Sequence, residues 1–462
     1  MTPRSPLRQA ISQATRLPEA EAMAPLLAQA CLSRNAADKA DALARQLIQG
    51  MREGPGPTGR AGRVQSLMQE YALSSEEGVA LMCLAEALLR IPDAATRDAL
   101  IRDKIGGGNW QQHIGQSSAL FVNAASWGLV LTGKLVATHN EGQLLGALTR
   151  LIGKQGEPLI RGGMQLAMQM LGEQFVTGET IHEALVRAKD MEARGFRYSY
   201  DMLGEAALTA ADAQRYFQSY EDAIHAMGQA AKGQGVYQGA GISIKLSALH
   251  PRYSRAQQER VMAELLPRVL QLTLLAKQYN IGLNIDAEEC DRLEISLDLL
   301  EALCFAPELA GWHGIGFVIQ AYQKRAPEVI DHIVMLVKKY NRRMMVRLVK
   351  GAYWDTEVKR TQERGLDDYP VFTRKLHTDV SYLAAMRLML SDQQAFYPQF
   401  ATHNAHTLAD EDAQFPDWLE IQNPNATPFN LAGYFLTDTP VLLNKWAFPP
   451  VTLAPNGFLV VF

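Results

Sequence analysis

The sequence predicts an α/β protein with three successive parts: a helical N-terminal region, a (β/α)-barrel-type parallel sheet and a short all-β segment. Residues 1 to about 190 show helical patterning without strand signals. From about Gly195 the pattern alternates between strand and helix, which is typical of a parallel sheet with crossover helices. After residue 410 basic residues almost disappear and short alternating β stretches follow. We therefore predict an N-terminal arm (1–60), a helical domain (61–190), a barrel (191–410) and a β segment (411–462).

The composition of the chain limits which kinds of partner it is expected to bind and in which cellular compartment it is expected. The chain has 462 residues and a formal net charge of −4, which argues against a nucleic-acid-binding surface. The four cysteines lie far apart in sequence and predict no metal or redox pair, so they fit a reducing compartment (Cys31, Cys83, Cys290 and Cys304). The N-terminus lacks signal-peptide order, and the most apolar stretch, 119–131, is too short to span a membrane. A cytoplasmic location is expected.

The N-terminal half carries helix signals but no recognisable chemistry. Residues 74–77, Ser-Ser-Glu-Glu, have capping-box spacing and open a helix that ends before Pro92. The Gly-Pro-Gly-Pro run within 51–62 predicts a flexible connector. Trp110 and Trp127 are interpreted as core residues, because aromatic side chains dominate protein cores.

Six strands and the helices between them define the predicted barrel. Amphipathic helices are expected at Arg255–Tyr279 and Ala326–Tyr340, among others. The predicted strands are Phe196–Met202, Gly241–Leu249, Ile281–Glu288, Gly314–Tyr322, Met344–Ala352 and Tyr397–His403.

Polar side chains gather toward the C-terminal ends of these strands, the face where barrel enzymes build their active sites. One such residue would be ordinary surface polarity, whereas its repetition at six successive strands favours function. The residues are Asp201, Glu205, Lys245, Asp286, Gln320, Arg347, Thr402, His403 and Asn404.

Arg347 lies inside a strand that is otherwise apolar, where an unpaired guanidinium is costly to bury. One interpretation is a buried ion pair. The other takes in the residues after the strand, since Gly351 permits close approach of a ligand to the backbone, and Tyr353 and Trp354 offer aromatic faces. Together these residue types predict a site for a flat anionic ligand.

Five motifs closely resemble the proline dehydrogenase domain of bacterial proline utilization A, and the resemblance runs from about Pro6 to about Asp410. They are Gly241-Ile-Ser-Ile-Lys-Leu-Ser-Ala-Leu-His-Pro-Arg-Tyr253, Asn284-Ile-Asp-Ala-Glu-Glu289, Gly314-Ile-Gly-Phe-Val-Ile-Gln-Ala-Tyr322, Val346-Arg-Leu-Val-Lys-Gly-Ala-Tyr-Trp354 and Phe400-Ala-Thr-His-Asn404. The resemblance implies a distorted (β/α)8 barrel that holds FAD and oxidises L-proline to 1-pyrroline-5-carboxylate by hydride transfer, in proline catabolism to glutamate. It also implies a quinone-type electron acceptor and at most peripheral membrane contact.

The same resemblance assigns roles to individual residues. Asp286 and Arg347 would be catalytic, and Lys245, Tyr353 and Glu205 would serve the proline pocket. The implied FAD contacts are Asp286, Ala287, Gln320, Arg347, Val349, Lys350, Gly351, Trp354, Thr373, Lys375, Thr402, His403 and Asn404. No metal site is expected, because His403 and His406 lack a third ligand.

The resemblance ends after Leu408, where the family continues with two further strands and a closing helix whose two arginines bind the substrate carboxylate. Here the chain instead resembles the start of a lamin tail domain (about 412–462), in 417–424, 430–438 and 445–449. The alternative function is therefore a catalytically impaired truncated fusion whose β segment is an interaction module. The sixth strand would keep an open edge, on which Trp418–Ile421 or Gly457–Phe462 could dock, but we expect the barrel to remain open. The sequence leaves the oligomeric state open.

Overall fold

The computed structural model describes residues 5–53, 96 and 176–402, and shorter stretches between 404 and 461. Contacts divide the chain into two units, Met1–Glu53 with Ser199–Phe462, and Gly54–Tyr198. Each unit is described by itself. The bounds of the four predicted domains remain predictions.

The first unit is built on a six-stranded sheet in the order β1-β2-β3-β4-β5-β6, with every neighbouring pair parallel. The strands are β1 (Ser199–Asp201), β2 (Gly241–Ile244), β3 (Gly282–Ile285), β4 (Ile315–Gln320), β5 (Met344–Val349) and β6 (Phe396–Phe400). All six predicted strands are thus present, each shorter than predicted. The predicted second strand is wrong beyond Ile244, because residues 246–249 form a helical turn, α11 (Leu246–Leu249).

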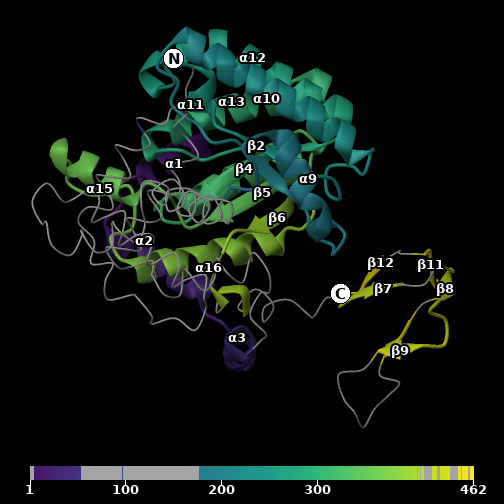
Figure 1. Ribbon diagram of the computed structural model, residues 1–462. Coiled ribbons are helices and arrows are strands. Elements are labelled where there is room, and N and C mark those ends of the chain that lie inside the picture. Colours follow the sequence, from purple (N-terminus) through teal and green to yellow (C-terminus); the bar gives the residue numbers. More distant parts are fainter. Residues whose placement is uncertain are drawn as a thin grey trace, which may run out of the picture. The chain divides into compact units, whose positions relative to one another are not determined.

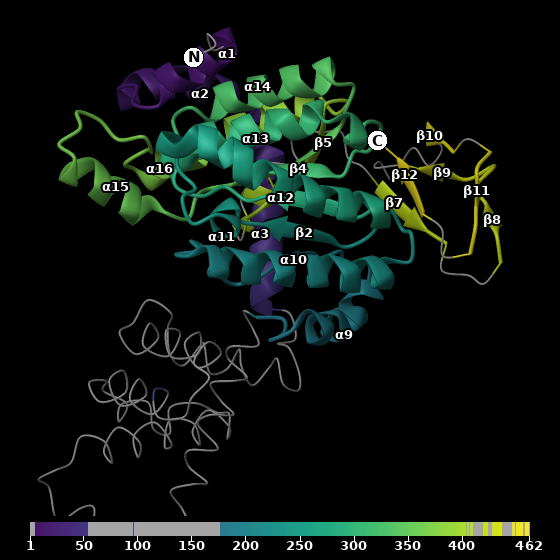
Figure 2. The same ribbon diagram turned by 90° about the horizontal axis from the view of Figure 1, so that it is seen from above.

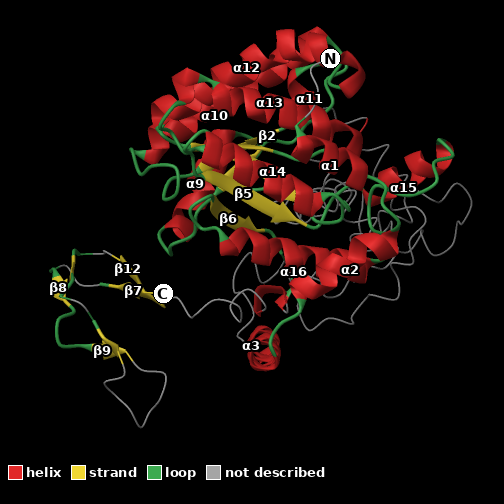
Figure 3. Cartoon of the chain, turned by 180° about the vertical axis from the view of Figure 1, so that it is seen from behind, coloured by secondary structure: helices red, strands yellow, loops and turns green. Residues whose placement is uncertain are grey.

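Helices follow the strands and cover the sheet in chain order (Figures 1 and 3). In that order, α10 packs on α12, α12 on α13, α13 on α14 and α14 on α16. The predicted helix at 255–279 begins with the short 3-10 turn Arg255–Gln257 before its α-helical part. The bounds are α10 (Ala210–Ala231), α12 (Gln258–Tyr279), α13 (Leu293–Phe305), α14 (Ala326–Lys339), α15 (Trp354–Glu363) and α16 (Lys375–Ser391), with further 3-10 turns at Cys290–Arg292 and Pro307–Leu309.

The core lies between the sheet and this helical layer. Every residue of β3 and β4 is buried, as expected for a parallel strand covered on both faces. Packing inside is close enough to require glycine at Gly316, where an added Cβ would lie 1.7 Å from the Asn284 Oδ1 atom. The central strands therefore provide a rigid base for the residues at their C-terminal ends.

An N-terminal arm of three helices precedes the sheet in sequence: α1 (Pro6–Ala14), α2 (Glu19–Ala30) and α3 (Arg34–Glu53). Helix α1 packs on α14 and α2 packs on α16, so the first two helices of the arm lie against the covering layer (Figures 1 and 2). Arg8, which is 5% exposed, donates to Glu294 and Asp298 of α13 at 2.7–2.8 Å. The arm is thus fixed to the first unit by buried charge as well as apolar packing.

In the second unit the structure describes residues 96 and 176–198, which contain helix α9 (Ile181–Glu192). Its N-cap Thr180 accepts a hydrogen bond from the Glu183 amide, which satisfies one of the free donors of the first turn. The predicted capping box at 74–77, Trp110, Trp127 and the apolar stretch 119–131 lie outside the described residues. Of the helices that can be described, none is long and apolar enough to cross a membrane.

The C-terminal segment forms three nested antiparallel pairs, β7 with β12, β8 with β11 and β9 with β10. Leu431, Phe448 and Leu453 are buried together between them. The expected all-β character is therefore present. Docking on the sixth strand is not observed, because β7 pairs with β12 and, among the described residues, β6 pairs only with β5. The strands are β7 (Leu419–Gln422), β8 (Phe429–Asn430), β9 (Phe435–Leu436), β10 (Trp446–Ala447), β11 (Thr452–Leu453) and β12 (Phe458–Val461).

Candidate active site

A cluster of charged side chains gathers at the C-terminal ends of the first three strands. Asp201 ends β1, Lys245 follows β2 and Asp286 follows β3. The Lys245 ammonium donates to both Asp201 carboxylate oxygens at 2.8 and 2.9 Å and to the Asp286 carboxylate at 3.1 Å. The parallel register brings these three residues together, because the C-terminal ends of parallel strands share one edge.

The charged side chains in this cluster shift one another's pKa values. Burial raises the pKa of Asp286, and the nearby Asp201 carboxylate adds to the shift, while Lys245 opposes it. Burial lowers the pKa of Lys245, but the two carboxylates outweigh it and hold the net pKa above the ordinary value. Lys245 is therefore a fixed cation at neutral pH.

Arg347 on β5 lies among neutral acceptors. Its guanidinium donates to the Ser199 hydroxyl at 2.7 Å, the Ser243 hydroxyl at 3.0 Å and the Gln399 amide oxygen at 3.1 Å. The nearest carboxylate oxygen, on Asp286, is 3.9 Å away, which is beyond hydrogen-bond distance. The interpretation of Arg347 as a simple buried ion pair is therefore incomplete, since three of its bonds go to uncharged groups.

Aromatic residues follow β5 as predicted. The Tyr353 hydroxyl donates to the Glu205 carboxylate at 3.1 Å, which joins two of the predicted substrate residues. Trp354 is 41% exposed, although its indole N–H donates to the Phe372 carbonyl. Gly351 has φ of +140°, and an added Cβ would lie 2.5 Å from the Tyr322 ring. Packing against Tyr322 therefore requires glycine at position 351, whether or not a ligand approaches the backbone there.

A second polar group lies at the start of α16. Lys350 and Lys375 both form ion pairs with Asp379. The Thr373 amide and hydroxyl donate to the Glu19 carboxylate of the arm at 3.1 and 2.7 Å, and His377 also bonds Glu19. Three of the predicted cofactor residues, Lys350, Thr373 and Lys375, are thus brought to one helix N-terminus.

For the remaining predicted site residues, the structure gives only burial and local contacts. The Gln320 amide oxygen accepts a hydrogen bond from Gln323 at 2.7 Å, and the residue is buried. The Val349 carbonyl accepts from the Ala321 amide, and Ala287 is half-buried. The Thr402 hydroxyl accepts from the Asn404 amide at 3.1 Å. His403 lies outside the described residues.

Sequence reasoning missed four polar partners of this site. Ser199, Ser243 and Gln399 hold Arg347, yet small or neutral side chains inside strands give no charge signal. Aligning the parallel strands residue by residue could have identified Gln399, which lies directly opposite Arg347. Glu19 comes from a helix 354 residues away in sequence from Thr373, and no local pattern could have indicated it.

Comparison with known proteins gives three matches to family models along the chain. Residues 184–415 match the model described as proline dehydrogenase, which is half of the chain. The chain belongs to the proline dehydrogenase family. Residues 5–52 match the proline utilization A proline dehydrogenase N-terminal domain, and residues 63–175 match the DNA-binding domain of proline dehydrogenase.

Individual relatives agree with this assignment. The chain is 67% identical over 407 residues to the bifunctional protein PutA of Escherichia coli, covering 88% of this chain and 31% of that protein. The Rhizobium meliloti protein of the same name is 60% identical over 407 residues, with 88% and 32% covered. A crystal structure of a Bradyrhizobium japonicum proline utilization A mutant matches with a TM-score of 0.64 and 46% identity, covering 86% of this chain and 39% of that chain. This chain thus spans about a third of the length of these curated relatives.

Proposed function

We propose that the chain is an FAD-dependent proline dehydrogenase that oxidises L-proline to 1-pyrroline-5-carboxylate in proline catabolism. The observation that carries the proposal is the cluster of Lys245, Asp201, Asp286 and Arg347 at the C-terminal edge of the sheet. In this cluster Lys245 is a fixed cation that could bind a substrate carboxylate. Arg347 is a second cation, and its hydrogen bonds go mainly to neutral groups. Family membership supports the same reaction.

Lys245 is the proposed anchor for the proline carboxylate. The three hydrogen bonds of its ammonium group all go to carboxylates, so a substrate carboxylate has to replace one of them. Asp201 is the better candidate for exchange, because its side chain is 47% exposed whereas that of Asp286 is 13% exposed. Asp286 would then keep Lys245 in place while the substrate binds. A fixed carboxylate determines which carbon of the ring faces the acceptor.

The residues present suit a flavin. When bound, FAD would accept the hydride and carry negative charge in its reduced form. Arg347 would stabilise that charge, since its nearest carboxylate is 3.9 Å away and its side chain is only 20% exposed. The exposed Trp354 ring offers a face for a flat group, and Lys350, Thr373 and Lys375 supply donors suited to phosphates. Ala287, Gln320, Val349, Gly351, Thr402, His403 and Asn404 remain proposed FAD contacts on the resemblance alone.

The test is proline-dependent bleaching of the flavin absorbance. The full chain, reconstituted with FAD and freed of oxygen, should bind flavin and lose its absorbance on addition of L-proline, with L-alanine as a control. Failure to bind flavin would contradict the cofactor assignment. The proposed cytoplasmic location and quinone-type acceptor can be examined by fractionation and by supplying a soluble quinone.

A second candidate function is that of a catalytically impaired chain whose C-terminal segment mediates contacts. Its support is the self-paired set of strands β7–β12, with a small apolar cluster of its own. The proposed likeness to a lamin tail domain would give that segment an interaction role. Flavin binding without proline-dependent reduction favours this candidate, and normal turnover rules it out.

A further inference from the structure

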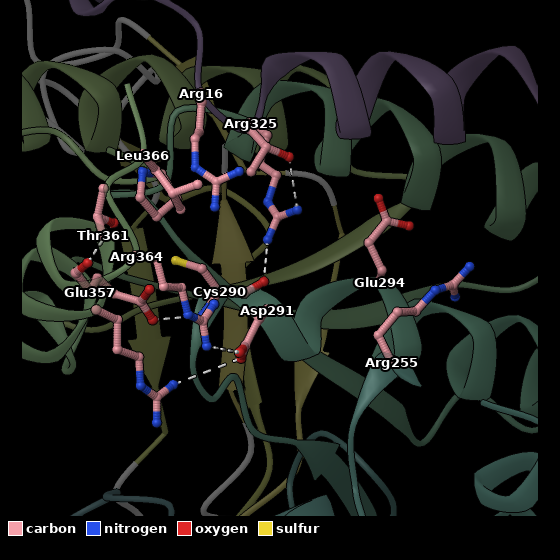
Figure 4. A pocket seen from close by; sticks show the side chains of 13 residues that line it. Arg16, Arg255, Cys290, Asp291, Glu294, Arg325, Glu357, Thr361, Arg364 and Leu366 are labelled. Atoms are coloured by element: carbon pink, nitrogen blue, oxygen red, sulfur yellow. Dashed lines mark hydrogen bonds and ion pairs between the residues drawn. The ribbon is translucent and has the colours of Figure 1, made fainter. Parts of the chain in front are cut away.

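A cavity of about 110 Å³ lies apart from the charged cluster, between the end of α1, the turn after β3 and helix α15 (Figure 4). It is far larger than the roughly 10–15 Å³ that one water requires. Five arginines and three carboxylates line it. Two of these arginines, Arg255 and Arg360, form ion pairs with Asp298 and Glu289, which do not line the cavity. The other three arginines are the groups that could bind an anion here.

The carboxylates at this cavity are already engaged or too distant. The Glu294 carboxylate bonds Arg8 and Ser12 of the arm. The Glu357 carboxylate accepts the Cys290 amide hydrogen at 2.7 Å, and burial raises the pKa of Glu357. Asp291 approaches Arg360 of α15 only at 3.9 Å and Arg364, which caps that helix, only at 3.8 Å. None of the three closely neutralises the cations that face the cavity.

Three guanidinium groups face the cavity without a close carboxylate among the described residues. Arg325 is 3% exposed, and its bonds go to the Gln323 amide oxygen, the Thr15 hydroxyl and the Cys290 carbonyl. Arg364 has Asp291 as its nearest acid, 3.8 Å away. Arg16 points toward the same space beside Arg325 (Figure 4). Burial lowers the pKa of Arg325; Cys290, Glu294 and Glu357 oppose this shift, and the positive charge of Arg16 adds slightly to it.

We propose that Arg16, Arg325 and Arg364 form a binding site for a dianionic phosphate group, carried by free phosphate or by a small phosphomonoester. Arginine presents paired donors that match the oxygens of phosphate, and three arginines complement a double charge. A second cavity of about 340 Å³ shares four lining residues with the first and has room for the rest of a phosphomonoester; the shared residues are Arg255, Asp291, Arg360 and Arg364. Because Arg16 belongs to the arm, the bound anion would connect the arm to the elements around the sheet.

The site is tested by titrating the full chain, loaded with FAD, with inorganic phosphate at constant ionic strength set by potassium chloride. FAD is included so that phosphate does not bind Lys350, Thr373 and Lys375, which are proposed to contact the phosphates of FAD. We expect saturable binding by calorimetry, with a Kd below about 1 mM. A parallel titration with glycerol 1-phosphate distinguishes the two ligand sources. If glycerol 1-phosphate binds more tightly than inorganic phosphate, the ligand is a phosphomonoester. If it binds equally or more weakly, the ligand is free phosphate.

Arg16→Gln and Arg364→Gln each remove one charged donor from an exposed side chain, so folding should be retained. Each should weaken phosphate binding about tenfold, the factor expected for one hydrogen bond to a charged group. The control Arg45→Gln changes an exposed arginine of α3 and should leave binding unchanged. Absence of saturable binding, or equal affinity in all three variants, would overturn the proposal. Neither result depends on whether proline is oxidised.

Discussion

At the residue scale, Arg347 is proposed to supply positive charge close to the flavin. Its donors go to Ser199, Ser243 and Gln399, which are all neutral, so its charge is available to a reduced flavin. Arg347→Met should slow proline-dependent flavin reduction by about a hundredfold, as expected for loss of one stabilising donor. Stopped-flow measurement of flavin bleaching gives the rate.

The control for this prediction is Arg347→Lys, which keeps the charge but loses the three-way donation. It should retain more of the reduction rate than the methionine variant. Equal rates in wild type and Arg347→Met, with flavin bound in both, would remove Arg347 from the mechanism.

His332 on α14 makes stability depend on pH. It is 1% exposed, and neither ring nitrogen has a partner among the described residues. Burial, with a contribution from Arg8, lowers its pKa from 6.5 to about 4. Between these values the unfolded chain binds more protons than the folded chain, so stability falls as pH decreases through this window. The loss reaches about 3 kcal/mol when His332 is the only group considered.

His332→Leu should remove this part of the acid sensitivity. Denaturant unfolding of the wild type and the variant, followed from about pH 7 to about pH 4.5, measures the difference in slope. His182→Leu, which changes an exposed histidine on α9, is the matched control and should leave the slope unchanged. A variant with the wild-type slope would show that His332 does not titrate as described.

At the element scale, the N-terminal arm depends on buried charge. Arg8 pairs with Glu294 at 2.8 Å and with Asp298 at 2.7 Å, and its side chain is 6% exposed. Removing one partner of a buried ion pair typically costs about 3–5 kcal/mol, and the cost here should be near the lower end, because Asp298 keeps Arg255 and Glu294 keeps Ser12 as partners. Arg8→Ala should therefore release α1, seen as faster amide hydrogen exchange in residues 6–14.

The control for Arg8→Ala is Arg45→Ala on α3. The Arg45 side chain is 77% exposed and pairs with Asp41. Such surface pairs are worth roughly 0–1 kcal/mol, so exchange in α1 should not change. Unchanged protection of α1 in Arg8→Ala would mean that apolar packing alone holds the arm.

The elements also show how far the sequence predicts the fold. Six parallel strands with polar C-terminal ends are predictable from apolar runs and their spacing, and Lys245 and Asp286 are correctly placed together. The second strand is predicted too long, because 246–249 is as apolar as a strand. In the structure the Glu288 carboxylate accepts the Ser247 amide hydrogen, and the Ser247 hydroxyl accepts the Ala206 amide hydrogen. These long-range bonds favour a helical turn, and a local pattern cannot report them.

At the scale of the whole molecule, the sheet does not close within the described residues. Its terminal strands are β1 and β6, and each has one strand neighbour. An open sheet edge presents unpaired backbone donors and acceptors, which favours pairing with another chain. β1 has three residues and ends in Asp201, whereas β6 has five residues and includes Phe396, Tyr397 and Phe400. The β6 edge is therefore the stronger candidate for self-association.

Pro398 reduces this tendency only in part, because proline lacks one donor while the rest of β6 keeps its own. We predict that the full chain forms concentration-dependent oligomers, detected by size-exclusion chromatography with light scattering. Phe400→Lys places a charge on the edge and should shift the distribution toward monomer. Phe305→Lys replaces a phenylalanine that is 70% exposed on α13 and should have a smaller effect. A wild-type chain that stays monomeric at all concentrations, with one sharp unfolding transition, would contradict association through β6.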